Sequence, residues 1–225
     1  MSPRLMGGPL LLLLWQVAPV GVKPDSAGRY RVTLGFGGGQ WEEQSCDRPP
    51  VPHEYRFAGG QIDAWPSTGI RVSGIGGALS YSGGRTLAVV GGVAAVEGQY
   101  FGIGGGVMTS GWADPNGDTR VPSIYLRAGN RDRLHFRFDM LAPSTTMPTT
   151  GVMRAGLGFN QGLLRGAAGF VGLGFTSFQP GLGPFAEISL PFGSALDLNA
   201  SGSWRPSAQY ADWGLSLGAR YTFGR

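Results

Sequence analysis

The chain is poor in charged residues and has almost no lysine or cysteine. Charged residues make up 14% of its 225 residues, whereas an ordinary soluble domain carries roughly 25%. Lys23 is the single lysine and Cys46 the single cysteine. Because Cys46 stands alone, an internal disulfide, a CxxC redox motif and a cysteine-based zinc cluster are all excluded.

A nucleic-acid partner is also disfavoured, although the net charge is +4. The arginines are scattered singly, with no basic run and no aromatic motif for stacking bases. Nor does any stretch after residue 28 reach 18 consecutive apolar residues, so no transmembrane helix is predicted.

The first 27 residues have the pattern of a secretory signal peptide. Arg4 supplies a positive start, and the apolar stretch from Pro9 to Val22 is too short for a membrane-spanning helix. We therefore expect a signal peptide at 1–27, with an ill-defined cleavage site, and one domain at 28–225. The alternative is a mis-assigned start codon or a buried apolar tail.

Glycine is strongly over-represented, at 41 of 225 residues, against an average near 7%. An interior glycine costs a helix about 1 kcal/mol relative to alanine, so a helical fold is disfavoured. Disorder is disfavoured too, because the glycines stand among large apolar residues. A β-fold with a crowded backbone remains.

From Arg29 onward the apolar residues recur with a period of two, as in half-buried strands. In "YRVTLGFGGG", Tyr30, Val32, Leu34 and Phe36 share one face, and Arg31 and Thr33 share the other. The stretches "RLHFRFDM", "VMRAGLGF" and "ALDLNASGSWR" alternate in the same way. Each strand thus has an apolar face and a face of charged, hydroxyl or glycine residues.

Turn signals divide this pattern into twelve predicted strands. They span residues 29–39, 54–64, 69–81, 85–96, 99–112, 121–129, 132–142, 151–160, 166–177, 184–191, 195–205 and 212–223. Ten strands remain possible, because 54–64 and 69–81 alternate poorly. Long connections are predicted at 40–53, 113–120, 143–150, 178–183 and 206–211, alternating with short ones; only Ser82–Gly84 is out of step. Outer-membrane barrels likewise alternate short periplasmic turns with long outer loops.

The predicted fold is therefore an all-β, closed, antiparallel up-and-down transmembrane β-barrel. Strand lengths of about 9–11 residues suit a tilted crossing of a bilayer. Aromatic residues gather near strand ends, as at Tyr30, Trp112, Trp204 and Trp213, which is typical of interfacial girdles. A soluble β-sandwich or barrel that binds a ligand is the alternative, because its strands alternate as well.

The last strand resembles the C-terminal β-signal of bacterial outer-membrane proteins. Ser216, Gly218, Tyr221 and Phe223 match that signal, although Gly224 and Arg225 follow the terminal aromatic residue. The resemblance implies a location in the outer membrane of a Gram-negative bacterium, with lipid as surroundings. It also implies recognition by the outer-membrane assembly machinery and closure of the last strand onto the first.

The polar face predicts which side chains enter the lumen. The candidate lumen residues are Arg31, Arg127, Arg133, His135, Arg137, Asp139, Arg154, Glu187, Asp197, Arg205 and Arg220. Two interpretations compete: a plug of arginine hydrogen bonds and ion pairs that stiffens the barrel, or a narrow, positively lined pore that favours anions.

Catalytic and metal-binding motifs are weak. Outer-membrane phospholipases use a Ser–His pair on the lipid-facing outer rim, whereas His135 is predicted to face inward with no assignable serine. The group Glu42, Glu43, Cys46, Asp47 and His53 is better explained as solvated loop charges than as a metal site. We expect no enzyme activity, no cofactor and no metal. The predicted function is a small, porin-like passive channel or a structural, loop-displaying barrel, with a phospholipase-like lipid-modifying enzyme as the alternative.

Overall fold

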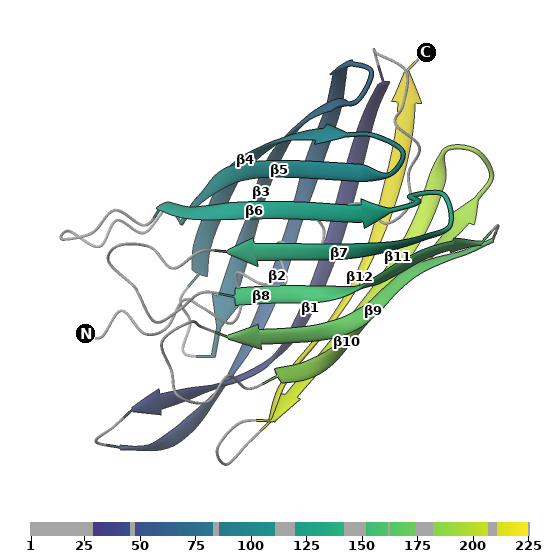
Figure 1. The fold of residues 1–225 in the computed structure, drawn as a ribbon. Helices are drawn as coiled ribbons and strands as arrows, with labels where there is room; N and C mark the ends of the chain where they lie inside the picture. Colours follow the sequence, from purple (N-terminus) through teal and green to yellow (C-terminus); the bar gives the residue numbers. More distant parts are fainter. Residues whose placement is uncertain are drawn as a thin grey trace.

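The computed structural model describes residues 29–45, 48–82, 86–110, 120–141, 152–161, 163–173, 182–206 and 211–224. They form twelve strands (Figure 1). The strands are β1 (Arg29–Ser45), β2 (Arg48–Ser67), β3 (Ile70–Tyr81), β4 (Thr86–Glu97), β5 (Phe101–Ser110), β6 (Arg120–Gly129), β7 (Leu134–Leu141), β8 (Val152–Gln161), β9 (Leu164–Leu173), β10 (Leu182–Phe192), β11 (Leu196–Pro206) and β12 (Ala211–Gly224). Among the described residues, no helix is long and apolar enough to cross a membrane.

The strands close into one antiparallel barrel. Each pairs with its neighbours in sequence, and β1 pairs with β12 from Arg29↔Gly224 to Gln40↔Trp213. The prediction of a closed, twelve-stranded up-and-down barrel is therefore confirmed. The β-sandwich form of the soluble alternative is excluded, because the described strands form one closed sheet without an open edge.

The connections β2–β3, β4–β5, β6–β7, β8–β9 and β10–β11 lie together at one end of the barrel, where β1 also begins and β12 ends. We call it the turn end. Three of its connections use a glycine with positive φ: Gly69 at 80°, Gly129 at 105° and Gly193 at 71°. That conformation costs glycine little and other residues much. The predicted pattern of short turns at the end that holds both barrel termini is thus observed.

One predicted long connection is wrong. The sequence pattern predicts a loop at residues 40–53, but β1 continues to Ser45 and β2 starts at Arg48, with pairing out to Ser45↔Arg48. This hairpin projects beyond the neighbouring strands (Figure 1), because β1 pairs with β12 only as far as Gln40. Local hydrogen bonding between the two strands continues past the barrel rim, where the sequence shows only weak alternation.

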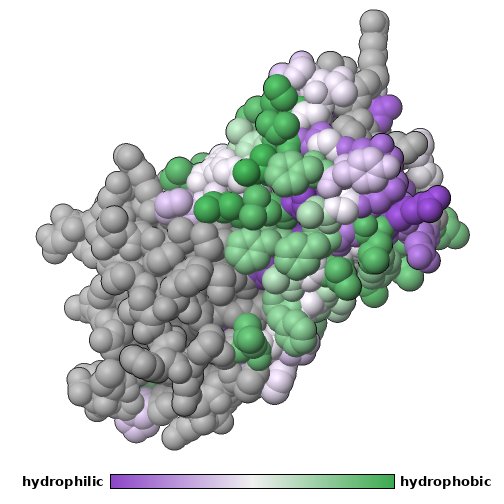
Figure 2. Space-filling model, viewed as in Figure 1, coloured by the Kyte–Doolittle hydropathy of each residue, from purple (hydrophilic) through white to green (hydrophobic). Residues whose placement is uncertain are grey.

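The exterior is apolar and the interior largely polar, the reverse of a soluble barrel. Leu34, Phe36, Leu157 and Phe170 are each more than half exposed, and apolar residues gather on the outer face of the strands (Figure 2). Arg31, Arg71 and Arg154 are almost completely buried. An apolar exterior of this kind suits contact with lipid chains.

Glycines in the wall make room for large side chains on adjacent strands. A Cβ at Gly37 would lie 2.6 Å from the ring of Phe57, and one at Gly39 would lie 2.5 Å from the hydroxyl of Tyr55. At Gly158 a Cβ would overlap the ring of His135. The absence of a Cβ at these positions therefore leaves space for the rings, which accounts for part of the glycine excess.

Candidate functional site: the charged lumen

Most of the predicted lumen residues are buried on the inner face. Arg31, Arg127, His135, Arg137, Arg154, Glu187, Asp197 and Arg220 are each at most 8% exposed. Asp139 and Arg205 are half-buried. Arg133 differs, because β7 begins at Leu134 rather than at the predicted residue 132. It therefore lies in the turn before β7 and is exposed.

The first group of lumenal charges, the Asp63 cluster, consists of Arg31, Asp63, Arg71 and Glu97 on β1 to β4. Arg71 lies 3.3 Å from Asp63 and 3.1 Å from Glu97. Arg31 lies 3.8 Å from Asp63, with its guanidinium 4.6 Å from the centroid of the Trp65 ring. The cluster therefore pairs two cations with two anions in the buried wall.

Hydrogen bonds hold Asp63 in place from both sides. Its carboxylate accepts bonds of 2.5 Å from the amide of Gln61 and from the hydroxyl of Ser73. Ser73 in turn accepts a 2.9 Å bond from Arg71. Such multiple satisfaction is what a buried carboxylate requires.

The sequence prediction missed Asp63, Arg71 and Glu97. Asp63 and Arg71 lie on β2 and β3, where alternation looked weak because glycines occupy both faces, and Glu97 lies one residue beyond the predicted strand 85–96. The alternation that could have revealed Asp63 and Arg71 is nevertheless present. The exposed Ile62 lies between Gln61 and Asp63, and the exposed Val72 lies between Arg71 and Ser73.

The second group, the Asp139 cluster, joins β7, β8 and β10. Asp139 lies 2.8 Å from both Arg137 and Arg154. Glu187 lies 3.4 Å from Arg154 and 3.9 Å from Arg137. The guanidinium of Arg154 also lies 4.9 Å from the ring centroid of Phe185. Here again two cations face two anions, and the ion pairs connect β7 and β8 with β10.

The third group contains Arg165, Asp197 and Arg220 on β9, β11 and β12. Asp197 lies 3.5 Å from Arg165 and 3.8 Å from Arg220. Unlike the other two clusters, this one has two cations for one carboxylate. Nearer the opposite end, Arg205 pairs with Asp212.

At the turn end, Arg127 fastens two turns together. Its guanidinium donates to the carbonyl oxygens of Gly98, Gln99, Phe101 and Gly129, at 2.5 to 3.4 Å. In the turn between β6 and β7, burial lowers the pKa of the Arg131 guanidinium. Nearby Asp132 opposes this lowering and Arg127 reinforces it. Arg127 is therefore satisfied by backbone carbonyls and does not need a carboxylate.

Part of the inner wall is apolar. Four large apolar side chains on β2 to β5 point inward and are at most 3% exposed: Phe57, Leu79, Val89 and Met108. The inner face thus carries large apolar side chains as well as the charged, hydroxyl and glycine residues that the sequence pattern predicted.

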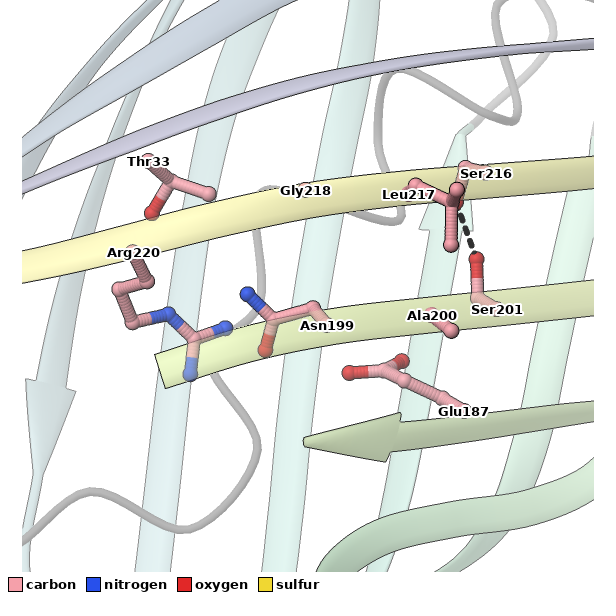
Figure 3. A pocket seen from close by; sticks show the side chains of 9 residues that line it. All are labelled: Thr33, Glu187, Asn199, Ala200, Ser201, Ser216, Leu217, Gly218 and Arg220. Carbon is pink, nitrogen blue, oxygen red and sulfur yellow. Dashed lines mark hydrogen bonds between the residues drawn. The ribbon is translucent and has the colours of Figure 1, made fainter. Parts of the chain in front are cut away.

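A small cavity of about 30 Å³ lies against β10, β11, β12 and β1 (Figure 3). Its polar lining residues are Thr33, Glu187, Asn199, Ser201, Ser216 and Arg220. Ser201 and Ser216 are hydrogen-bonded to each other at 2.5 Å. The side chains of Arg220, Asn199 and Glu187 point toward the same space (Figure 3).

The residues of the C-terminal signal fall on both faces of β12. Ser216 and Gly218 line the cavity, whereas Tyr221 and Phe223 are exposed on the outside. Phe223 stacks on Tyr30 of β1, with ring centroids 5.7 Å apart. The outward part of the signal therefore lies on the seam where the barrel closes.

Within the described part of the chain, no three His, Cys, Asp or Glu residues are grouped as metal ligands. Cys46 and Asp47 lie outside it, as do the side chains of Glu42 and Glu43. The predicted signal peptide, residues 1–27, also lies outside the described residues.

Several solved structures are similar in fold. The translocator domain of the autotransporter NalP from Neisseria meningitidis matches with a TM-score of 0.51 and 17% identity, over 88% of this chain and 90% of that one. The beta domain of the Bordetella autotransporter BrkA matches at 0.48 and 18%, over 88% and 99%. A mutant of the Rh. blastica porin matches at 0.42 and 10%, over 87% and 100%.

The chain has the fold of a bacterial outer-membrane β-barrel. The closed strand order and the apolar exterior establish the architecture, and the similarity to the translocator domain agrees with it. No family model and no curated protein matches the sequence. The role of this outer-membrane barrel must therefore be argued from its own lumen.

Proposed function

We propose that the protein is a structural barrel of the outer membrane whose lumen is closed by buried ion pairs. In this role the barrel anchors the chain in lipid and presents the segments at the end opposite the turn end. One observation carries the proposal: the cations of the Asp63 and Asp139 clusters are at most 4% exposed and are paired with carboxylates. Arginines that line a water-filled pore would instead be exposed to that water.

The geometry of the pairs supports closure over conduction. Arg154 and Arg137 on β8 and β7 both reach Glu187 on β10. Arg71 on β3 lies 5.9 Å from the ring centroid of Tyr125 on β6. Side chains that reach over several strands fill interior space, as they do in eight-stranded barrels; the strand number itself does not decide, because twelve lies between these and the porins of sixteen or more strands that leave a channel.

Planar-bilayer recording of the purified, folded protein tests this proposal. The expected result is no steady conductance. Steady anion-selective conductance that falls in Arg137→Gln would overturn it and favour the passive channel. Arg133→Gln is the matched control, because Arg133 is exposed in a turn outside the lumen and should leave any conductance unchanged.

We also propose that the barrel is not a lipid hydrolase. His135 is 3% exposed and faces inward, near the turn end of β7, where it cannot reach a lipid ester on the outer rim. An assay of phospholipid hydrolysis checks this, and activity that is lost in His135→Ala would refute it.

Assembly is proposed to depend on the C-terminal strand and the outer-membrane assembly machinery. The support is the position of Tyr221 and Phe223 on the outer face, beside Tyr30 at the β1–β12 seam. A partner that binds the free edge of β12 before the barrel closes would contact both aromatic residues.

A further inference from the structure

We propose that two copies of this barrel associate in the outer membrane as a two-fold symmetric dimer. The contact is the outer face of β1, β2 and β3, and the symmetry axis is parallel to the membrane normal and passes beside β2. The proposal rests on the membrane location of the barrel and not on the closure of its lumen. Two observations carry it: the charge of this face and its shape are each self-complementary about that axis.

The charge of the face comes from Glu54 and Arg56 on β2. Among the outward strand positions whose side chains the structure describes, these two alone carry charge, and both are exposed. No ion pair or hydrogen bond joins either side chain to another described residue. The buried Tyr55 stands between them, so they share the outer face about 7 Å apart. A two-fold axis between the two positions brings Arg56 of each copy to Glu54 of the other.

The depth of the two charges suits an ion pair between barrels. Glu54 pairs with Gln40 of β1, and Gln40 pairs with Trp213 of β12, which is exposed on the outer face. Outward tryptophan is typical of the membrane–water interface, so the two charges lie near the lipid head groups. Water and head groups solvate charges at that depth, and therefore the ion pair fixes the orientation and choice of the partner more than the affinity.

The shape of the face differs on the two sides of β2. On one side, Leu34 and Phe36 of β1 project outward and are 62% and 60% exposed. On the other side, the outward residues of β3 include Gly74, Gly76 and Ala78. A two-fold axis beside β2 exchanges these sides. The large residues of β1 in one copy therefore lie opposite the small residues of β3 in the other.

Packing within the barrel does not require the two glycines of β3. A Cβ at Gly74 or Gly76 would meet nothing within 4 Å, whereas one at the inward Gly37 would overlap neighbouring atoms. Glycine weakens a strand and often marks the close approach of another backbone. Between transmembrane helices, small residues promote association because close packing, not the hydrophobic effect, holds the helices together in lipid. The same physics applies to two barrel walls, so the space over β3 suits the large β1 residues of a second copy.

Cross-linking of single cysteines in outer membranes tests the proposal. In a Cys46→Ser background, Ala58→Cys places a thiol outward on β2, two residues from Arg56 and close to the axis. A residue near a two-fold axis lies near its own copy, so a short bismaleimide should join two chains. Ala168→Cys on β9 is the matched control, because Ala168 is also exposed on the outer face but belongs to a distant strand. It should give no dimer above background.

Charge reversal tests the orientation of the two copies. Arg56→Glu and Glu54→Arg should each lower the cross-linked yield of Ala58→Cys about tenfold, because like charges then meet across the axis. The two reversals combined restore opposite charges and should recover most of the yield. Gly76→Leu fills the space over β3 and should also lower the yield. It should retain the heat-modifiable folded form, because an added Cβ there meets nothing within 4 Å.

Lipid is the other occupant of this face, and it predicts a different result. A face covered only by lipid would give equal yields for Ala58→Cys and Ala168→Cys and no response to charge reversal, and either outcome would overturn the proposal. Failure of the combined reversals to recover the yield would overturn it as well. Should a charge variant fail to assemble, Gly76→Leu decides, and an unchanged yield in that variant would exclude this contact.

Discussion

Replacing Asp63 with asparagine should be among the most destabilising single substitutions in the lumen. The asparagine side chain would keep the volume of the original one but remove the charge that lies between Arg31 and Arg71. These two arginines are 0% and 1% exposed, so water cannot replace the lost carboxylate. Glu97 would remain as the only acidic partner of Arg71 among the described residues.

The size of the effect follows from the two distances. At an effective dielectric constant of about 20, unit charges 3.3 Å and 3.8 Å apart attract by about 5 and 4 kcal/mol. The variant regains part of this lost attraction, because a neutral asparagine avoids the several kcal/mol that burying the carboxylate costs. The net loss in free energy of unfolding should be about 3–5 kcal/mol.

Urea unfolding of the protein in lipid vesicles, followed by tryptophan fluorescence, measures this loss. Asp132→Asn is the control, since Asp132 pairs with Arg131 at 3.5 Å but is 36% exposed, and it should cost less than about 1 kcal/mol. Arg31→Met in the Asp63→Asn background removes the surplus cation and should restore roughly 1–2 kcal/mol. A loss below about 1 kcal/mol in Asp63→Asn would refute the view that this cluster is a buried, charge-balanced unit.

Two further predictions concern packing and assembly. Gly158→Ala should destabilise the barrel by about 1–3 kcal/mol, because its Cβ would overlap the His135 ring. Gly74→Ala is the control and should not destabilise the barrel, because its Cβ meets nothing within 4 Å. Equal urea midpoints for the two variants would contradict this reasoning. Phe223→Asp should impair insertion, measured as loss of the heat-modifiable band in membranes. Phe192→Asp places a similar charge on the exposed outer face but outside the last strand, so equal impairment in both variants would argue against a signal at Phe223.

The sequence alone determined the strands and the two faces of the barrel. Alternation depends on side chains that project to opposite sides of an extended chain, so Leu34 and Arg31 could be assigned to lipid and lumen from the pattern alone. The weakness of that reasoning appeared at β2 and β3, where glycine occupies both faces and hides the inward Asp63 and Arg71. It also failed for residues 40–53, since pairing beyond the barrel rim needs no apolar face.

Only the tertiary structure decided which charges meet. Arg154 and Glu187 are 33 residues apart, and their contact depends on the register of the strands between β8 and β10. A shift of one residue would turn either side chain to the lipid face. The seam between β1 and β12 likewise brings Thr33 beside Arg220 and creates a cavity from opposite ends of the chain. Local pattern fixes the direction of each side chain, whereas ion pairing depends on distances of a few ångströms that register and closure set.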